Sequence, residues 1–216
     1  MKTMTEQAHE YDPQLKSPRG LRAAPKRMRD RVFAHVAVSG RERGAVAVEM
    51  AIVLPILVAL TFGIVEFSSA YHDRSAAADA ARAGARVGSA LPAKPTMASS
   101  VVQSVNAALS TMPRNAPQEL WIYKANSAGY PGGSSSFSSC STNCIKYTWS
   151  SGARAFTGGS GGGWPASAQQ ACTQPFDQIG VYVKLNHAFV TGLFGSNVTL
   201  TDHAVFRFEP QPATEC

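Results

Sequence analysis

The sequence predicts an α+β protein: a long N-terminal transmembrane helix followed by a small antiparallel sheet and a second helix. Residues 45–67 form a continuous apolar run, and a helix needs about 20 such residues to cross the hydrocarbon core of a membrane. An alanine-rich stretch with few helix breakers follows, and the C-terminal part contains short segments of alternating apolar and polar residues. We therefore expect a leader over residues 1–44, a helix with its extension over residues 45–90, and a folded domain over residues 91–216.

The positive charge of the chain is concentrated in the leader. The 216 residues include 20 Lys and Arg and 14 Asp and Glu, and the formal net charge is +6. Ten of the basic and five of the acidic residues lie in residues 1–44, so the rest of the chain is nearly neutral and is not expected to bind nucleic acid. The leader also has three prolines and little apolar periodicity, which predicts disorder. An alternative role for the leader is a basic arm that binds nucleic acid. Met28 is an alternative start to Met1 and would give a shorter leader that is still basic.

The basic residues next to the apolar run predict its orientation in a membrane. Arg41 and Arg43 lie just before it, and the positive-inside rule places that side in the cytoplasm. The expected location is the bacterial inner membrane, crossed once, with the C-terminal domain outside the cytoplasm. A cleaved secretory signal is the competing interpretation, but its apolar region is usually shorter and ends in a small-residue cleavage site.

Three residues interrupt the apolar run, namely Glu49, Pro55 and Glu66. Glu66 lies near the outer end, where headgroups and water are expected to solvate it. Pro55 removes one helical hydrogen bond and is expected to kink the helix. Glu49 lies about one turn inside the run, where an unpaired carboxylate costs on the order of 2.5 kcal/mol or more if it sits deep in lipid, so we expect a cationic partner or a protonated side chain.

The residues from Arg43 to Glu49 resemble a type IV prepilin processing site, because a glycine follows the basic leader and a glutamate stands five residues after that glycine. The resemblance implies that a prepilin peptidase cleaves between Gly44 and Ala45. Glu49 would then be the fifth residue of the mature chain and could neutralise the new α-amino group of a neighbouring subunit. The alternative is an unprocessed chain in which Glu49 snorkels to the cytoplasmic interface.

The longer segment RGAVAVEMAIVLPILVALTFGIVEFSSAYHDRSAAADAARAGAR, residues 43–86, resembles the N-terminal pattern of the TadE-like family. Residues 190–210 are similar to the family's closing hairpin, with less specificity. The resemblance implies a minor pilin or pseudopilin of the tight-adherence (type IVb/c) pilus system, which acts in pilus assembly and surface adhesion. Its implied partners are the prepilin peptidase, the major pilin, sibling TadE/TadF-type subunits, the inner-membrane Tad assembly platform and membrane lipid. An unprocessed, membrane-anchored binding or adhesion domain is the alternative.

The folded domain is expected to contain two helices and a small sheet. Pro92 and Pro95 end the long helix near Ser89, and an apolar stripe predicts a second helix over residues 97–112. Alternation predicts strands over residues 181–185 and 198–208, joined by a turn at 192–197, and shorter strands at 121–124 and 145–149. A Gly/Ser-rich stretch, about residues 125–167, predicts a mobile loop.

All four cysteines fall on the side expected to be outside the cytoplasm, where disulfides form. Cys140 with Cys144 and Cys172 with Cys216 would fit two disulfides, although four cysteines permit three connectivities. A zinc site is the rival, but the C-x3-C spacing lacks a second short-spaced ligand pair. We therefore expect no metal and no other cofactor.

The sequence contains no recognisable catalytic signature. His187 and His203 fall on predicted strands and are expected to be solvated, and no nucleophile-elbow motif or carboxylate pair accompanies them. The glycine run at residues 158–163 is not followed by the Gly-Lys-Ser/Thr of a phosphate-binding loop. We expect a protein that is not an enzyme.

Overall fold

The computed structural model describes residues 42–212 and 214. The chain divides into two compact units, Met1–Ile52 and Val53–Cys216. Helix α1, Glu42–Ser89, is continuous and contributes to both, and it includes Pro55 in its interior. In the first unit, the residues described are the helical residues 42–52, and the predicted leader lies almost entirely outside the described part.

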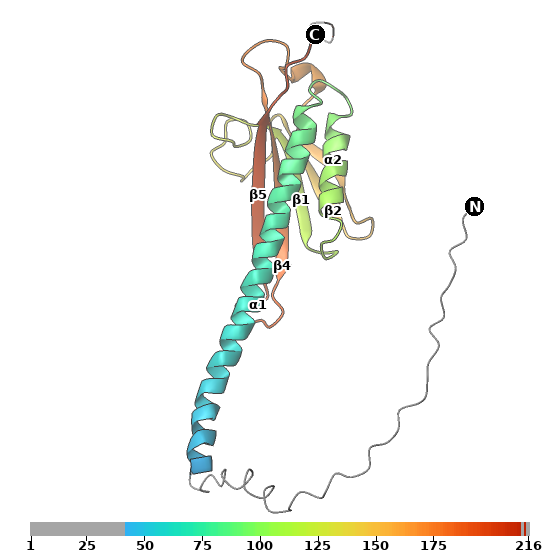
Figure 1. Cartoon of the computed structure of the whole chain (residues 1–216). Coiled ribbons are helices and arrows are strands. Elements are labelled where there is room, and N and C mark those ends of the chain that lie inside the picture. The colour runs from blue at the N-terminus through green and yellow to red at the C-terminus, as the bar shows by residue number, and fades with distance from the viewer. Residues whose placement is uncertain (1–41, 213, 215–216) are drawn as a thin grey trace, which may run out of the picture. The chain divides into compact units, whose positions relative to one another are not determined.

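The second unit combines helices with one five-stranded antiparallel sheet, which confirms the predicted α+β class (Figure 1). The strands lie in the order β3-β2-β1-β4-β5, and α1 and α2 lie over one face of the sheet. The bounds of the elements that follow α1 are α2 Met97–Ala108, β1 Pro117–Lys124, β2 Cys144–Ser150, β3 Ala155–Gly163, the 3-10 helix η1 Ala166–Ala168, β4 Gln178–Ala188 and β5 Asn197–Arg207.

The predicted strand pair near the C-terminus is confirmed as the long hairpin β4–β5. Its register runs without a shift from the pair Gln178 and Arg207 to the pair Ala188 and Asn197. The expected strands at 121–124 and 145–149 also form, as parts of β1 and β2. The second helix ends at Ala108 instead of residue 112, but Leu109 and Met112 are still buried in the core.

The Gly/Ser-rich stretch is more ordered than the sequence predicts. It contains all of β2 and all of β3, although only the strand at 145–149 was predicted there and the rest of residues 125–167 was expected to form a mobile loop. Glycines occupy four positions of β3 before Gly163, so alternation of side chains gives no strand signal there. The glycines also permit close backbone approach, because a Cβ atom at Gly162 would overlap the carbonyl oxygen of Ser141.

The core lies between the sheet and the two helices. The inward side chains of β1 and β4 are large and apolar, whereas those of α1 are small. A Cβ atom at Gly84 would lie 2.7 Å from Val105 Cγ2 of α2 and 3.3 Å from Val181 Cγ1 of β4. The two helices and β4 can therefore approach one another this closely only because position 84 has no side chain.

The opposite face of the sheet carries aromatic residues under the β1–β2 connection. Trp121, Tyr123 and Tyr182 form a second buried cluster, and Phe137 of the connection stacks on Tyr182 with ring centroids 4.5 Å apart. Next to them, Lys146 Nζ lies 3.1 Å from the carboxylate of Glu119. Burial alone would raise the pKa of Glu119, but hydrogen bonds from Lys146 and Trp121 and the charges of Lys146 and Lys184 lower that pKa overall.

We expect Gly84→Leu to destabilise the folded domain, because the added side chain must displace Val105 and Val181. Overpacking of this kind typically costs about 1–3 kcal/mol. The measurement is thermal unfolding of the full chain in detergent, followed by circular dichroism. Arg86→Leu is the matched control, since Arg86 is exposed on the same helix, and an equal loss of stability in both variants would contradict the packing argument.

Candidate functional site

The N-terminal part of α1 exposes an apolar surface. Every large hydrophobic side chain from Val46 to Phe67 is between 40% and 71% exposed. Within the described residues, α1 is the one helix that is long and apolar enough to cross a membrane, and none of its most apolar window is buried. Such a surface requires lipid or neighbouring apolar helices as its surroundings.

The predicted processing site lies at the start of this helix. Gly44 and Ala45 are exposed, and among the described residues nothing beyond the adjoining residues and the local helix backbone lies within 4 Å of the position that a Cβ atom at Gly44 would occupy. Glu49 is exposed as well and has no hydrogen-bond or ion-pair partner among the described side chains. Its carboxylate is thus available to a group from outside the described part of the chain.

Glu66 differs from the sequence expectation. It was expected to be solvated at the membrane interface, but only 1% of the residue is exposed. Its carboxylate accepts hydrogen bonds from the N–H of Val190 at 3.0 Å, and from the N–H and hydroxyl of Thr191 at 2.5 Å and 2.7 Å. The charged side chain therefore fastens α1 to the connection between β4 and β5, 125 residues later in the chain.

We call this connection the hairpin tip (residues 189–196). Its backbone conformation directs two N–H groups to the carboxylate of Glu66. The N–H of Phe189 donates to the carbonyl of Ser196 at 3.1 Å and closes the loop. Gly192 and Gly195 adopt positive φ angles of 72° and 103°, which allow the chain to reverse. The N–H groups of Val190 and Thr191 are left without partners in the strand ladder and point to Glu66.

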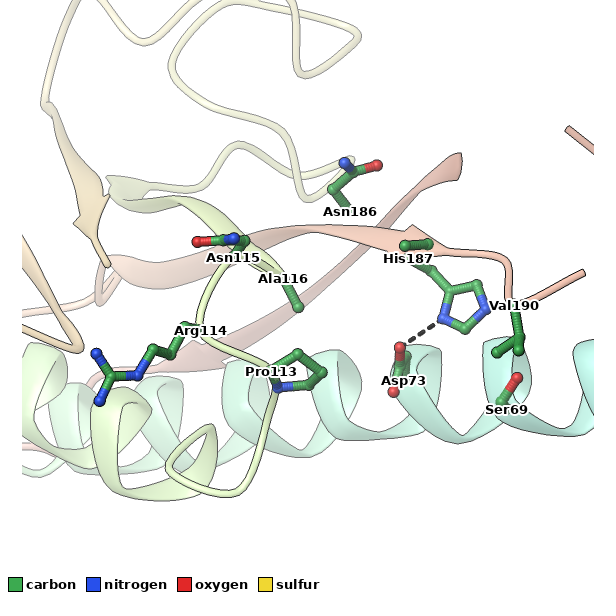
Figure 2. Close-up of a pocket in the computed structure, with 10 residues that line it drawn as sticks. Ser69, Asp73, Pro113, Arg114, Asn115, Ala116, Asn186, His187 and Val190 are labelled. Atoms are coloured by element: carbon green, nitrogen blue, oxygen red, sulfur yellow. Dashed lines mark hydrogen bonds and ion pairs between the residues drawn. The ribbon is translucent and has the colours of Figure 1, made fainter. Parts of the chain in front are cut away.

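A second polar contact joins α1 to the β4–β5 hairpin, at the end of β4 just before the hairpin tip. His187 Nδ1 at the end of β4 lies 2.6 Å from Asp73 Oδ2 of α1, and His187 is 5% exposed. The expectation that His187 is a solvated strand histidine is therefore wrong, whereas His203 is exposed. Figure 2 shows the imidazole of His187 extending from β4 to Asp73, above the helix that also carries Ser69.

Ser69, Asp73 and His187 line one cavity of about 450 Å³, so a hydrolytic arrangement has to be tested on geometry. The hydroxyl of Ser69 donates to the main-chain carbonyl of Glu66 at 2.9 Å. His187 Nε2 is buried and has no hydrogen-bond partner among the described residues. The hydrogen bond from serine to histidine that would activate the serine as a nucleophile is therefore missing. The Asp73–His187 contact instead links strand β4 to helix α1.

Two further expectations concern the pairing of the cysteines and the presence of a metal site. Cys140 and Cys144 form a disulfide, with their Cα atoms 5.3 Å apart. Cys172 is also disulfide-bonded, and Cys216, with which the sequence predicts that it pairs, lies outside the described residues. Within residues 42–212, no group of three or more His, Cys, Asp or Glu side chains is arranged to hold a metal ion.

The sequence signals identified part of this site and missed the rest. They marked Gly44, Ala45 and Glu49, which lie together at the exposed start of α1. They did not pair Glu66 with Thr191 or Asp73 with His187, because both pairs join segments more than 110 residues apart. The sequence offered two hints: Glu66 is a charged residue at the end of an apolar run, and His187 has the same parity as the inward-facing residues of its strand.

Together these features define a class of protein, one with a single candidate membrane helix in its described residues, in which the C-terminal half of that helix packs as part of an α+β domain. Residues 44–86 match the family model described as TadE-like protein, which confirms the resemblance inferred from the sequence. No curated protein and no solved structure matches the chain.

We expect Glu66→Gln to loosen the junction, because an amide replaces a carboxylate that accepts three hydrogen bonds and its NH2 group would face donors. Exchange of the Val190 and Thr191 amide hydrogens with solvent should accelerate roughly tenfold or more. The measurement is hydrogen exchange of the full chain in detergent. The same substitution at the exposed Glu49 is the control, and unchanged exchange in Glu66→Gln would show that the carboxylate does not hold the hairpin tip.

Proposed function

We propose that this protein is a TadE-like minor pilin or pseudopilin that acts in the assembly of tight-adherence pili. The observation that carries the proposal is the match of residues 44–86 to the TadE-like family. That segment starts at the predicted cleavage glycine and includes the whole exposed apolar surface of α1. The TadE-like family is not an enzyme family, and the arrangement of Ser69, Asp73 and His187 supports a structural role.

The first step of this function is maturation by a prepilin peptidase. Hydrolysis of the peptide bond between Gly44 and Ala45 would leave a carboxylate on Gly44 and an α-amino group on Ala45. The exposure of both residues supports access by the peptidase. The basic residues before Gly44 favour a cytoplasmic location for the bond, and the α+β domain would then lie on the opposite side of the inner membrane.

The second step is association through the apolar half of α1. An exposed carboxylate in an apolar environment is costly unless a positive group neutralises it, and the described part of the chain offers Glu49 none. The α-amino group of a neighbouring mature subunit has the required charge and would be the partner of Glu49 in a helix bundle. The partners that we propose are the major pilin, sibling TadE/TadF-type subunits and the inner-membrane assembly platform, in a bilayer environment.

Cleavage is tested by co-expression of the chain with its prepilin peptidase, followed by intact mass and N-terminal sequencing of the membrane-extracted protein. We expect a peptidase-dependent N-terminus at Ala45. Gly44→Leu should abolish it, because a large side chain replaces the residue that precedes the scissile bond. Gly63→Leu, which changes a glycine of the same helix far from that bond, should be processed like the parent chain.

An unprocessed chain under every condition would overturn the maturation step. It would instead favour the alternative function, a permanently anchored extracytoplasmic binding or adhesion domain. Processing at another bond would retain a pilin-like maturation but refute the assignment of Gly44 and Ala45.

The assembly contact is tested by Glu49→Gln, which removes the negative charge and keeps the shape of the side chain. We expect normal cleavage at Ala45 but loss of most crosslinking between the mature subunit and its pilus partners in the membrane. Glu49→Asp, which keeps the charge, should retain part of the crosslinking. Equal crosslinking in the parent and in Glu49→Gln would exclude the charge of Glu49 as the assembly contact.

A further inference from the structure

The hairpin tip exposes an uncharged apolar surface. Its eight residues include no Asp, Glu, Lys, Arg or His. Val190 is 84% exposed, Leu193 61% and Phe194 48%. Single exposed hydrophobic residues are ordinary on a protein surface, but three on one short loop mark a site of interaction with another apolar phase.

The tip lies beside the part of α1 that is expected to leave the membrane. The rings of Phe194 and Phe67 are 5.0 Å apart between centroids. A Cβ atom at Gly63 would lie 3.8 Å from Phe194 Cζ. Phe194 therefore lies along the last turns of the apolar run, and its exposed surface continues that of the helix.

The tip also covers the charge that would otherwise interrupt this surface. Between Glu49 and Asp73, Glu66 is the only Asp, Glu, Lys or Arg in the sequence. Its carboxylate is covered by Val190 and Thr191, which donate its hydrogen bonds. The exposed surface of α1 beyond Glu49 thus remains without charge until the turn that follows Phe67, where Tyr71 is 73% exposed, as is typical of an aromatic residue at a membrane interface.

We propose that the hairpin tip is a second membrane contact, in which Val190, Leu193 and Phe194 enter the boundary between headgroups and acyl chains on the outer side of the bilayer. The proposal rests on α1 as a membrane span and goes beyond the pseudopilin function, because it assigns a lipid-binding surface to the folded domain. A span alone would let the domain rotate about the helix axis relative to the bilayer. Insertion of the tip fixes which side of the domain faces the lipid.

Lipid fits this surface better than a second protein. A stable protein interface buries about 800 Å² per partner over roughly 20–30 residues, far more than an eight-residue loop supplies. The continuity of the tip with the exposed apolar surface of α1 places both in the same surroundings. Burial of apolar side chains in the headgroup and acyl boundary needs neither shape complementarity nor a charged partner.

The test uses the full chain with Leu193→Trp in vesicles of phosphatidylethanolamine and phosphatidylglycerol, in which the lipid acyl chains carry bromine near their carbonyl ends. Bromine quenches tryptophan fluorescence at short range, so a second set of vesicles carries bromine near the methyl ends of the acyl chains to reach the bilayer centre, where Val58 is expected. The parent chain supplies the signal of the native tryptophans for subtraction. Two matched variants accompany it. Val58→Trp reports the predicted span, and Ser127→Trp reports an exposed turn at the opposite end of the sheet.

We expect a blue-shifted emission and a loss of fluorescence in brominated vesicles for Leu193→Trp, and neither for Ser127→Trp. The proposal is overturned if Leu193→Trp is quenched no more than Ser127→Trp while Val58→Trp is quenched. It is also overturned if Leu193→Trp is protected from water-soluble acrylamide but not quenched by the lipid, since a protein copy would then cover the tip. Absence of quenching in Val58→Trp would refute the span itself, and with it the basis of both proposals.

Discussion

The close approach of α1 to β4 is the constraint on which the rest of the domain depends. In the apolar core the helix presents small residues to the sheet, namely Ala77, Ala80, Ala81, Gly84, Ala85 and Gly88. Strand β4 lies against them with large aliphatic side chains, and α2 fills the adjoining space with its own apolar stripe. Because β4 also pairs with both β1 and β5, the position of the whole sheet follows from this one packing surface.

Polar contacts extend the same arrangement beyond the apolar core. Along β4 and the hairpin tip, His187 meets Asp73 and Thr191 meets Glu66, so the hairpin follows α1 antiparallel for several turns. The helix thus serves two environments. Its N-terminal part exposes apolar side chains, and its C-terminal part is packed in the folded domain. Glu66 lies at the boundary between these two parts of the helix. The segment that matches the TadE-like family includes both parts.

The sequence predicted those features of the fold that leave a local signal. The apolar run, the prolines after Ser89 and the alternation in β4 and β5 each act within a few residues, and all three gave the correct elements. Strand β3 was missed because its glycines have no side chains to alternate. The buried states of Glu66 and His187 were missed because their partners lie more than 110 residues away in the chain, where neither periodicity nor spacing carries information. Gly44, Ala45 and Glu49 were found because their motif is contiguous.

The long separation of these partners has a consequence for biogenesis. Helix α1 leaves the ribosome well before the residues that close onto it, because Thr191 follows Glu66 by 125 residues. Contacts of such high sequence separation form late and make folding slower than local contacts do. The apolar core side chains of β1, which pairs with β4, must therefore stay uncovered until β4 has been synthesised as well. A membrane-spanning α1 would confine the unfinished chain to the bilayer surface during that interval, and the same helix would provide the surface on which the β4–β5 hairpin becomes ordered.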